Sequence, residues 1–406
     1  MGKRSRCSCV KKRIRGGKTV DVRLKIGEPI VVKMGVTYES APWGPYQFPM
    51  LRRLPDGRIA LQYHAVADNC EAYGQEKAWA VSEDEGKSWR ELLSNEVAEV
   101  IACFGERLPS GKYIDYITHK PYLISDEYHA ELTRIARTHA DVLAMEELPD
   151  LFPKTYTFRI ADPKSGEVEM FDCELDFPGM TTWLCQGAIV RPTLFSKLRV
   201  APDGTLWLPH YIKGRNPHNL GYTTYYNCYY FCSTDEGRSF QLRSWIQYMP
   251  DTNEFPEAFL TEGFCEPDIC FMPDGSIITL MRTGFRTPSY LARSTDNGYT
   301  WSKPQIFDRC GVCPQLQSLS CGVTLASYGR PGLFVRATDD PVGQSWGDPV
   351  TLIPYNYNEC MKDSCCYTSM IPLDDRTALL AYSDFRVQDG DGVARKCIIV
   401  RTVRVD

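Results

Sequence analysis

A short turn motif occurs four times in this chain and constrains its fold more than any other feature. Each copy combines a small hydroxyl residue, an Asp that can hydrogen-bond its own backbone, a Gly that can adopt positive φ, and an aromatic residue to bury. The copies are Ser82–Trp89, Ser233–Phe240, Ser294–Trp301 and a looser Thr338–Trp346. Each predicts a tight hairpin turn, and the repetition indicates a repeat protein.

A second repeated signature runs in step with the first and predicts paired strands. Apolar residues flank a Pro-Asp-Gly turn or a relative of it, which is typical of an antiparallel hairpin. It occurs at Leu54–Gly57, Leu108–Gly111, Ala201–Gly204, Met272–Gly275, Ala326–Gly329 and Leu373–Asp375. In four of these six units the turn motif follows where a third strand would pass to a fourth. We therefore predict an all-β fold, a six-bladed β-propeller of four-stranded antiparallel blades.

The domain organisation follows from this repeat. We expect residues 1–40 to form an N-terminal arm and lead-in strand and residues 41–406 to form the propeller. The gap between Gly111 and Ala201 is the longest between hairpin signatures, so an insertion is expected at about 120–180. Its segment Asp126–Met145 has helical composition, which predicts a helix near 125–147. That helix could either cap the propeller or form a wall of the substrate site.

Composition excludes several classes of partner. The net charge is −5 and the basic residues are spread out, apart from an arm at Lys3–Arg15 that we interpret as a solvated terminus, so no nucleic acid is expected. No apolar stretch approaches 18 residues and no hydrophobic run follows the basic start, which predicts a cytoplasmic protein without a membrane span. The 17 cysteines are then expected to be reduced core residues. Cys310-Gly-Val-Cys313 and Cys365-Cys366 could meet at a zinc ion, but the second half of a ligand set at its usual spacing is missing. No metal or cofactor is therefore predicted.

The turn motifs and the blade count resemble the sialidase (neuraminidase) superfamily, whose six-bladed propellers carry this Asp-box or BNR repeat. The resemblance covers about residues 40 to 405. It implies a glycosidase acting on a sugar with a carboxylate beside the anomeric carbon, which is gripped by fixed arginines. It also implies a Tyr nucleophile activated by a Glu, because a carboxylate nucleophile would be repelled by that substrate, and an Asp that serves as acid and base.

Four residues match the functional segments of that family. Tyr367, in Cys-Tyr-Thr-Ser, is implied to be the nucleophile, and Glu266, in Glu-Pro-Asp, its activating partner. Arg282 follows 16 residues after Glu266, where a carboxylate-binding Arg is expected. Arg330 is implied to be a second substrate clamp, with Arg336 as its substitute.

One departure from the family pattern puts the substrate in question. The family has an Arg-Ile-Pro motif at the start of the first blade, and this chain has Gln47-Phe-Pro. A charge-assisted hydrogen bond is worth about 1.5–3 kcal/mol, so Gln47 is expected to weaken carboxylate binding. We predict that its amide points into the pocket beside Arg282 and Arg330.

Other candidates for the site come from the first and third blades. The acid/base residue is expected at Glu71, with Asp68 as the rival, and both could be plain loop carboxylates. His64 lies eight residues past Asp56, as Arg282 lies eight past Asp274, so both are expected at the same end of their blades. Arg191 and His210 are further candidates for substrate binding.

Three hypotheses about function stay open. The first is a retaining, sialidase-like exo-glycoside hydrolase that removes a terminal acidic sugar from a glycan. The second is another exo-acting carbohydrate enzyme on this fold, arabinanase-like or a uronic-acid-cleaving hydrolase or lyase. The third is a non-catalytic glycan-binding propeller, which needs no pair of facing ionisable groups. All three predict a carbohydrate partner, and none predicts the oligomeric state.

Overall fold

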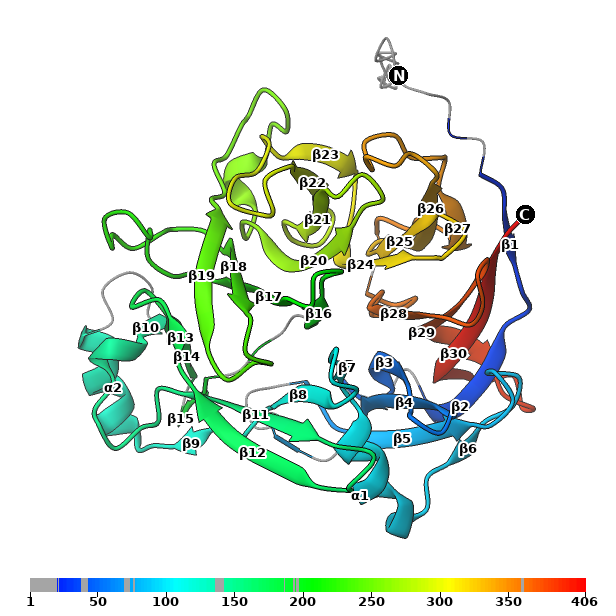
Figure 1. The fold of residues 1–406 in the computed structure, drawn as a ribbon, viewed down its shortest axis with the longest axis horizontal. Helices are drawn as coiled ribbons and strands as arrows, with labels where there is room; N and C mark the ends of the chain where they lie inside the picture. Colours follow the sequence, from blue (N-terminus) through cyan, green and yellow to red (C-terminus); the bar gives the residue numbers. More distant parts are fainter. Residues whose placement is uncertain are drawn as a thin grey trace, which may run out of the picture.

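The chain folds into a six-bladed β-propeller. The computed structural model describes residues 20, 22–37, 43–68, 74–75, 77–135, 142–185, 187–192, 194, 197–358 and 361–406. Six antiparallel sheets stand around a common centre, and the first strand of each lies nearest to it (Figure 1). The predicted fold class is thereby confirmed.

The first three blades run through residues 47–246. Blade one holds β3 (Gln47–Arg53), β4 (Ile59–His64), β5 (Lys77–Ser82) and β6 (Arg90–Glu91). Blade two holds β7 (Glu106–Arg107), β8 (Tyr113–Ile117), β11 (Tyr156–Ala161) and β12 (Val168–Cys173). Blade three holds β16 (Arg199–Val200), β17 (Leu206–Ile212), β18 (Asn227–Ser233) and β19 (Phe240–Ile246), with β13 (Leu175–Asp176) added in parallel to β19.

The last three blades complete the ring. Blade four holds β20 (Cys265–Phe271), β21 (Ile277–Arg282), β22 (Ser289–Ser294) and β23 (Gln305–Asp308). Blade five holds β24 (Val312–Ser318), β25 (Thr324–Gly329), β26 (Leu333–Thr338) and β27 (Val350–Ile353). Blade six holds β28 (Thr368–Pro372), β29 (Thr377–Gln388) and β30 (Ala394–Val405).

Both ends of the chain meet in blade six. The strands β1 (Leu24–Ile26) and β2 (Ile30–Thr37) pair with β30 (Figure 1). Residues before the expected boundary at 40 thus supply the outer strands of the last blade. The expected solvated arm at Lys3–Arg15 lies outside the described residues.

The four turn motifs connect the third and fourth strands of blades one, three, four and five. In the first copy, Ser82 Oγ accepts from Gly86 N (2.8 Å), and Asp84 Oδ1 accepts from Ser88 N (2.8 Å). Asp84 Oδ2 also accepts from Ser88 Oγ (2.6 Å). The copies at 233–239 and 294–300 repeat this network. The turn is thus held by local hydrogen bonds.

Five of the six predicted hairpins form where the signature placed them, and one prediction is wrong. Ala326–Gly329 lies inside β25, and the turn of that blade is Leu319–Gly322. There Leu319 N donates to Val323 O, and Gly322 N donates to Leu319 O, the pattern seen at Leu54 and Gly57. The sequence at this turn lacks both Pro and Asp, so only the backbone, with Gly322 at φ 89°, identifies it.

The insertion expected at about 120–180 is a small sheet with one helix on it, at the edge of blades two and three (Figure 1), but its range differs from the expected one. The blade-two strands β11 and β12 lie inside 120–180, and two strands of the inserted sheet follow residue 180. The sheet holds β9 (Tyr122–Leu123), β10 (Val142–Ala144), β14 (Thr181–Cys185) and β15 (Ala188–Ile189). The helix α2 covers Asp126–Ile135, and residues 136–141 lie outside the described part. The predicted helix therefore fails at 142–147, where β10 and a 3-10 turn (Met145–Glu147) replace it. Pairing with β14 and burial of Val142–Ala144 override the local helical propensity.

The core lies between the blades. Apolar residues from neighbouring sheets form shared clusters, and Trp301 of one turn motif packs on Tyr230 of the preceding blade at 4.6 Å between ring centroids. The helix α1 (Ser94–Cys103) and the 3-10 turn Ala258–Leu260 lie outside the blades. Twelve described cysteines are free, but Cys185 is disulfide-bonded, so the expectation of reduced cysteines is wrong there. No helix in the described ranges is long and apolar enough to cross a membrane.

Candidate active site

Four of the predicted site residues lie together at one end of the propeller. Tyr367 directly precedes β28, and Glu266 is the second residue of β20; both strands are the first of their blades. Arg282 ends β21 and Arg330 follows β25, which are second strands running the opposite way. The starts of first strands and the ends of second strands share one edge of each blade. The fold therefore collects these residues from blades four, five and six.

The backbone is strained where the first strands start. Phe48, Glu266, Cys313 and Cys366 all have positive φ, between 41° and 61°. The pairing shifts register beside three of them, in β3, β20 and β24. Such conformations cost about 1–3 kcal/mol each and cluster at functional sites, where bulges redirect side chains.

Glu266 is the centre of the hydrogen-bonded group. Its Oε1 accepts from the Tyr367 hydroxyl and from Arg282 Nη1 (2.7 Å), and its Oε2 accepts from Cys313 N (2.7 Å). The residue is only 7% exposed. A buried carboxylate with this many donors is held in one orientation, and its Oε1 faces the phenol.

The surroundings of Tyr367 keep its proton in place at rest. Burial, followed by the adjacent Glu266 carboxylate, raises the pKa of Tyr367 well above its ordinary value, while Arg282 opposes the rise. Arg282 Nη1 lies 3.4 Å from the phenol oxygen. The phenol therefore ionises only if Glu266 takes its proton, and Arg282 is positioned to stabilise the resulting phenolate.

Arg282 and Arg330 differ in their carboxylate partners. Arg282 Nη2 contacts both oxygens of Glu262 (3.1 and 3.2 Å), so this guanidinium pairs with two carboxylates. Arg330 lies over the rings of Trp43 (5.1 Å) and Tyr367 (5.5 Å), and its Nη2 donates to Cys365 O (2.5 Å). Among the residues that the structure describes, no carboxylate accepts a hydrogen bond from Arg330.

Asp68 lies on the first-blade side of this group, and Glu71 lies outside the described residues. Burial raises the pKa of Asp68, Lys77 and Arg330 oppose the rise, and Glu266 adds to it. Asp68 is thus within electrostatic reach of both Arg330 and Glu266. Its raised pKa is what a general acid requires.

His64 is held by a lysine and does not contact the central carboxylate. Its Nε2 lies 2.8 Å from Lys77 Nζ, and its ring packs edge-on against Phe48 at 4.8 Å. Burial and then Lys77 lower the pKa of His64 to about 3, so the ring is neutral at pH 7. Burial lowers the pKa of Lys77 to about 8, with Asp68 opposing.

The structure does not bring Gln47 into the group. Gln47 is fully buried, and its amide oxygen accepts from Lys396 Nζ (3.2 Å) and from Gly44 N (3.2 Å). The next residue, Phe48, packs edge-on against Tyr367 at 4.8 Å. Positive φ at Phe48 breaks the alternation of the strand, so the sequence position alone did not reveal which side chain faces the phenol.

Three further candidates lie elsewhere. Arg191 packs over the Tyr122 ring of the inserted sheet at 5.1 Å. Arg336 donates to the carbonyls of Gly347 (2.7 Å) and Phe307 (2.9 Å), a structural role in blade five. His210 is 1% exposed, and burial lowers its pKa to about 3.

Three residues near the site were missed by sequence reasoning. Glu262 lies in a loop four residues before Glu266. Its closeness in sequence to Glu266, the partner of Arg282, was the one feature that could have indicated a contact with Arg282. Lys77 begins β5, whose motif at Ser82 predicts only the turn that follows, and Lys396 belongs to β30, which carries no motif. Their positions follow only from strand pairing and from packing between blades one and six.

Comparison with solved structures agrees with the propeller. A protein of unknown function from Dyadobacter fermentans aligns over 94% of this chain and 99% of its own, with 12% identity and a TM-score of 0.64. The Hadza microbial sialidase Hz136 aligns over 92% of this chain and 68% of its own, with 13% identity and a TM-score of 0.51. At these identities the similarity shows the fold. No protein-family model and no curated protein sequence matches the chain.

Proposed function

We propose that this protein is a retaining exo-glycoside hydrolase that uses Tyr367 as nucleophile and Glu266 as its base. The observation that carries the proposal is the hydrogen bond from the buried Tyr367 hydroxyl to Glu266, with Arg282 beside the phenol oxygen. A tyrosine with a purely structural role needs one hydrogen-bond acceptor and no cation. A nucleophilic tyrosine needs an acceptor for its proton and a cation to stabilise the phenolate.

The chemistry runs in two balanced steps. In the first, Glu266 takes the phenol proton, the Tyr367 oxygen bonds to the anomeric carbon, and the bond to the leaving oxygen breaks as Asp68 donates a proton to it. In the second, Asp68 takes a proton from water, the water oxygen bonds to the anomeric carbon, and the Tyr367 oxygen leaves and recovers its proton. Two inversions at one carbon give net retention.

The substrate proposed is a terminal acidic sugar, held by Arg330 and by the outer nitrogen of Arg282. Glu262 competes for that nitrogen, but its side chain is 41% exposed and can be displaced. Arg330 supports the proposal because its charge is not paired with a carboxylate in the described contacts, and a guanidinium fork fits a carboxylate well.

The pairing of Arg282 with two glutamates favours a second candidate, the same hydrolase acting on a neutral terminal sugar. Around Tyr367, Glu262 and Glu266 already balance the two arginines in charge. A neutral sugar would bind without displacing Glu262.

Reporter substrates test both candidates. Release of a reporter phenol from α-linked sialic acid, Kdn or Kdo is expected from the wild type and is lost in Tyr367→Phe. Tyr299→Phe, which removes an exposed hydroxyl on a turn, is the control and keeps its rate. The first product seen by NMR retains its anomeric configuration. Turnover of neutral reporter glycosides alone selects the second candidate, and no turnover of either class by folded protein contradicts the proposal.

A further inference from the structure

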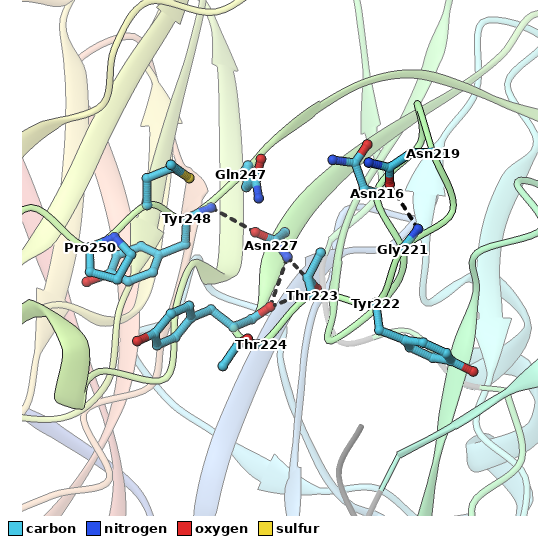
Figure 2. Close-up of a pocket in the computed structure, with 12 residues that line it drawn as sticks. Asn216, Asn219, Gly221, Tyr222, Thr223, Thr224, Asn227, Gln247, Tyr248 and Pro250 are labelled. Atoms are coloured by element: carbon cyan, nitrogen blue, oxygen red, sulfur yellow. Dashed lines mark hydrogen bonds between the residues drawn. The ribbon is translucent and has the colours of Figure 1, made fainter. Parts of the chain in front are cut away.

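Blade three carries a cavity of about 350 Å³. Figure 2 shows the residues that line it. Its walls are the loop between β17 and β18 and the segment that follows β19. The loop leaves the end of a second strand, as Arg282 ends β21. The cavity thus lies at the edge of the propeller that carries Tyr367.

The cavity is polar but uncharged. None of the twelve residues that line it is Asp, Glu, Lys, Arg or His, although 24% of the chain is Asp, Glu, Lys or Arg. The lining holds three side-chain amides with access to the space, Asn216, Asn219 and Gln247, and the ring of Tyr222 stands at one side (Figure 2). An ionic ligand would find no counter-charge here, so the chemistry fits a neutral ligand that forms many hydrogen bonds.

Two of the three amides, those of Asn216 and Asn219, are held in place before any ligand binds. Asn216 Oδ1 accepts from His218 N (2.8 Å), and Asn219 Oδ1 accepts from Gly221 N (2.9 Å). The loop also closes on itself, because Leu220 N donates to Asn216 O (2.8 Å). Each Asn thus uses its oxygen in the turn and keeps its Nδ2 group as a fixed donor. Fixed donors lose little entropy on binding.

Apolar groups frame the same space. Met249, in the lining, is 71% exposed, and the neighbouring loop residue Leu220 is 42% exposed. Beneath them Asn227 is internally satisfied, with its Oδ1 bonded to Tyr248 N and its Nδ2 to Thr223 and Tyr225 (Figure 2). A rigid floor, amide donors and apolar edges suit a sugar ring, which presents hydroxyls at its rim and C–H groups on its faces.

The cavity is joined to the catalytic group through Tyr226. This residue follows the lining residue Tyr225, and its backbone N donates to Glu262 O (2.9 Å). Its ring packs against Tyr211 at 5.5 Å. Burial raises the pKa of Tyr211 well above its ordinary value, and the nearby Glu266 and Tyr367 add to the rise. Glu262 in turn holds Arg282. A short chain of contacts, through Tyr226 and Glu262, therefore connects the cavity to Arg282.

We propose that this cavity is a binding subsite for a neutral sugar, which holds the part of a glycan beyond the residue that is cleaved. The assignment of that glycan as a substrate rests on the proposed function, but the binding of neutral sugar does not. An acidic terminal sugar at Arg330 and a neutral sugar in the cavity would together select the end of a mixed glycan.

Saturation-transfer NMR on the Tyr367→Phe chain tests the subsite without turnover. The probes are neutral disaccharides of glucose, galactose, mannose, N-acetylglucosamine and arabinose. At least one is expected to bind, and Asn219→Ala and Gln247→Ala are each expected to weaken its Kd by about three- to tenfold through loss of a neutral hydrogen bond. Asn253→Ala removes an exposed amide outside the cavity and should leave Kd unchanged.

Three outcomes overturn the subsite. They are no binding of any probe to folded protein, binding that neither cavity variant weakens, and binding that free sialic acid displaces, because that last result places the probe at Arg330. Inactivity of the wild type on every reporter glycoside, with probe binding intact and sensitive to Gln247→Ala, would end the proposed function and leave a glycan-binding site.

Discussion

The amide oxygen of Gln47 accepts a hydrogen bond from Nζ of Lys396, and both side chains are buried, with 0% and 2% exposure. Lys396 also lies 5.0 Å from the centre of the Phe385 ring. A lysine from blade six thus stands behind the position where the sialidase pattern has an arginine. The ammonium group of Lys396 is therefore almost fully buried beside Gln47.

Gln47→Arg is therefore expected to destabilise the protein and not to improve carboxylate binding. It would place a second buried cation against Lys396, a cost of about 3–5 kcal/mol in the free energy of unfolding. Urea unfolding measures the loss. Lys396→Met should recover part of it in the double variant, and Gln241→Arg on the exposed side of β19 should cost little. Tighter binding of a sialidase inhibitor by stable Gln47→Arg protein would contradict this arrangement.

Glu266→Ala should cost both activity and stability. It leaves the Arg282 Nη1 group and the Cys313 N–H without their buried acceptor, which is expected to lower the free energy of unfolding by about 3–5 kcal/mol. Glu266→Gln keeps the volume and one acceptor, so about 1–3 kcal/mol is expected. Both variants should lose turnover by at least about 100-fold, as expected for a missing general base. Near-normal turnover in Glu266→Gln would show that the residue is purely structural.

Asp68→Asn should affect substrates according to their leaving groups. With a sugar as leaving group, kcat is expected to fall by about 10² to 10⁴ because the departing oxygen is no longer protonated. With a nitrophenol, which leaves without a proton, bond cleavage should change little. The raised pKa of Asp68 keeps it protonated to a higher pH than an ordinary Asp, so wild-type activity falls as pH rises through that pKa. The fall of activity at high pH should therefore be absent from the pH–rate profile of Asp68→Asn. If Glu71→Gln instead shows this leaving-group dependence and loses the fall at high pH, Glu71 is the general acid.

Asp84→Asn should reveal a pH-dependent contribution of the turn motif to stability. Hydrogen bonds from Ser88 lower the pKa of Asp84 to about 2, below its ordinary value of 3.8. A group with a lowered folded-state pKa stabilises the fold above its unfolded pKa and loses that effect as pH falls toward the folded value. The Tm of the variant is thus expected below that of wild type at pH 7, with the gap closing between about pH 4 and pH 2. Asp296→Asn, in the third copy of the motif, should show the same pH-dependent difference in Tm. The control Asp391→Asn should have the Tm of the wild type at each pH. A difference in Tm between Asp84→Asn and wild type that does not change with pH would contradict this role of Asp84.

Motifs that fold through their own residues were predictable from sequence. The turn at Asp84 forms from hydrogen bonds within seven residues, so its chemistry is visible in the sequence itself. The two errors in the fold have the opposite origin. The turn Leu319–Gly322 has no side-chain signal, and Val142–Ala144 became a strand because β14 was available to pair with it.

The sequence by itself determined the blade repeat and the residue types at the ends of the inner strands, because turn chemistry and strand alternation are local properties. Tertiary structure alone decided what those residues meet. Tyr367 reaches Glu266 from 101 positions away, and Gln47 turns to Lys396 of another blade. The direction of each side chain depends on positive φ at Phe48, Glu266 and Cys366 and on closure of the ring by β1 and β2. Strained backbone angles persist only where surrounding packing imposes them, and that packing comes from residues far apart in the chain.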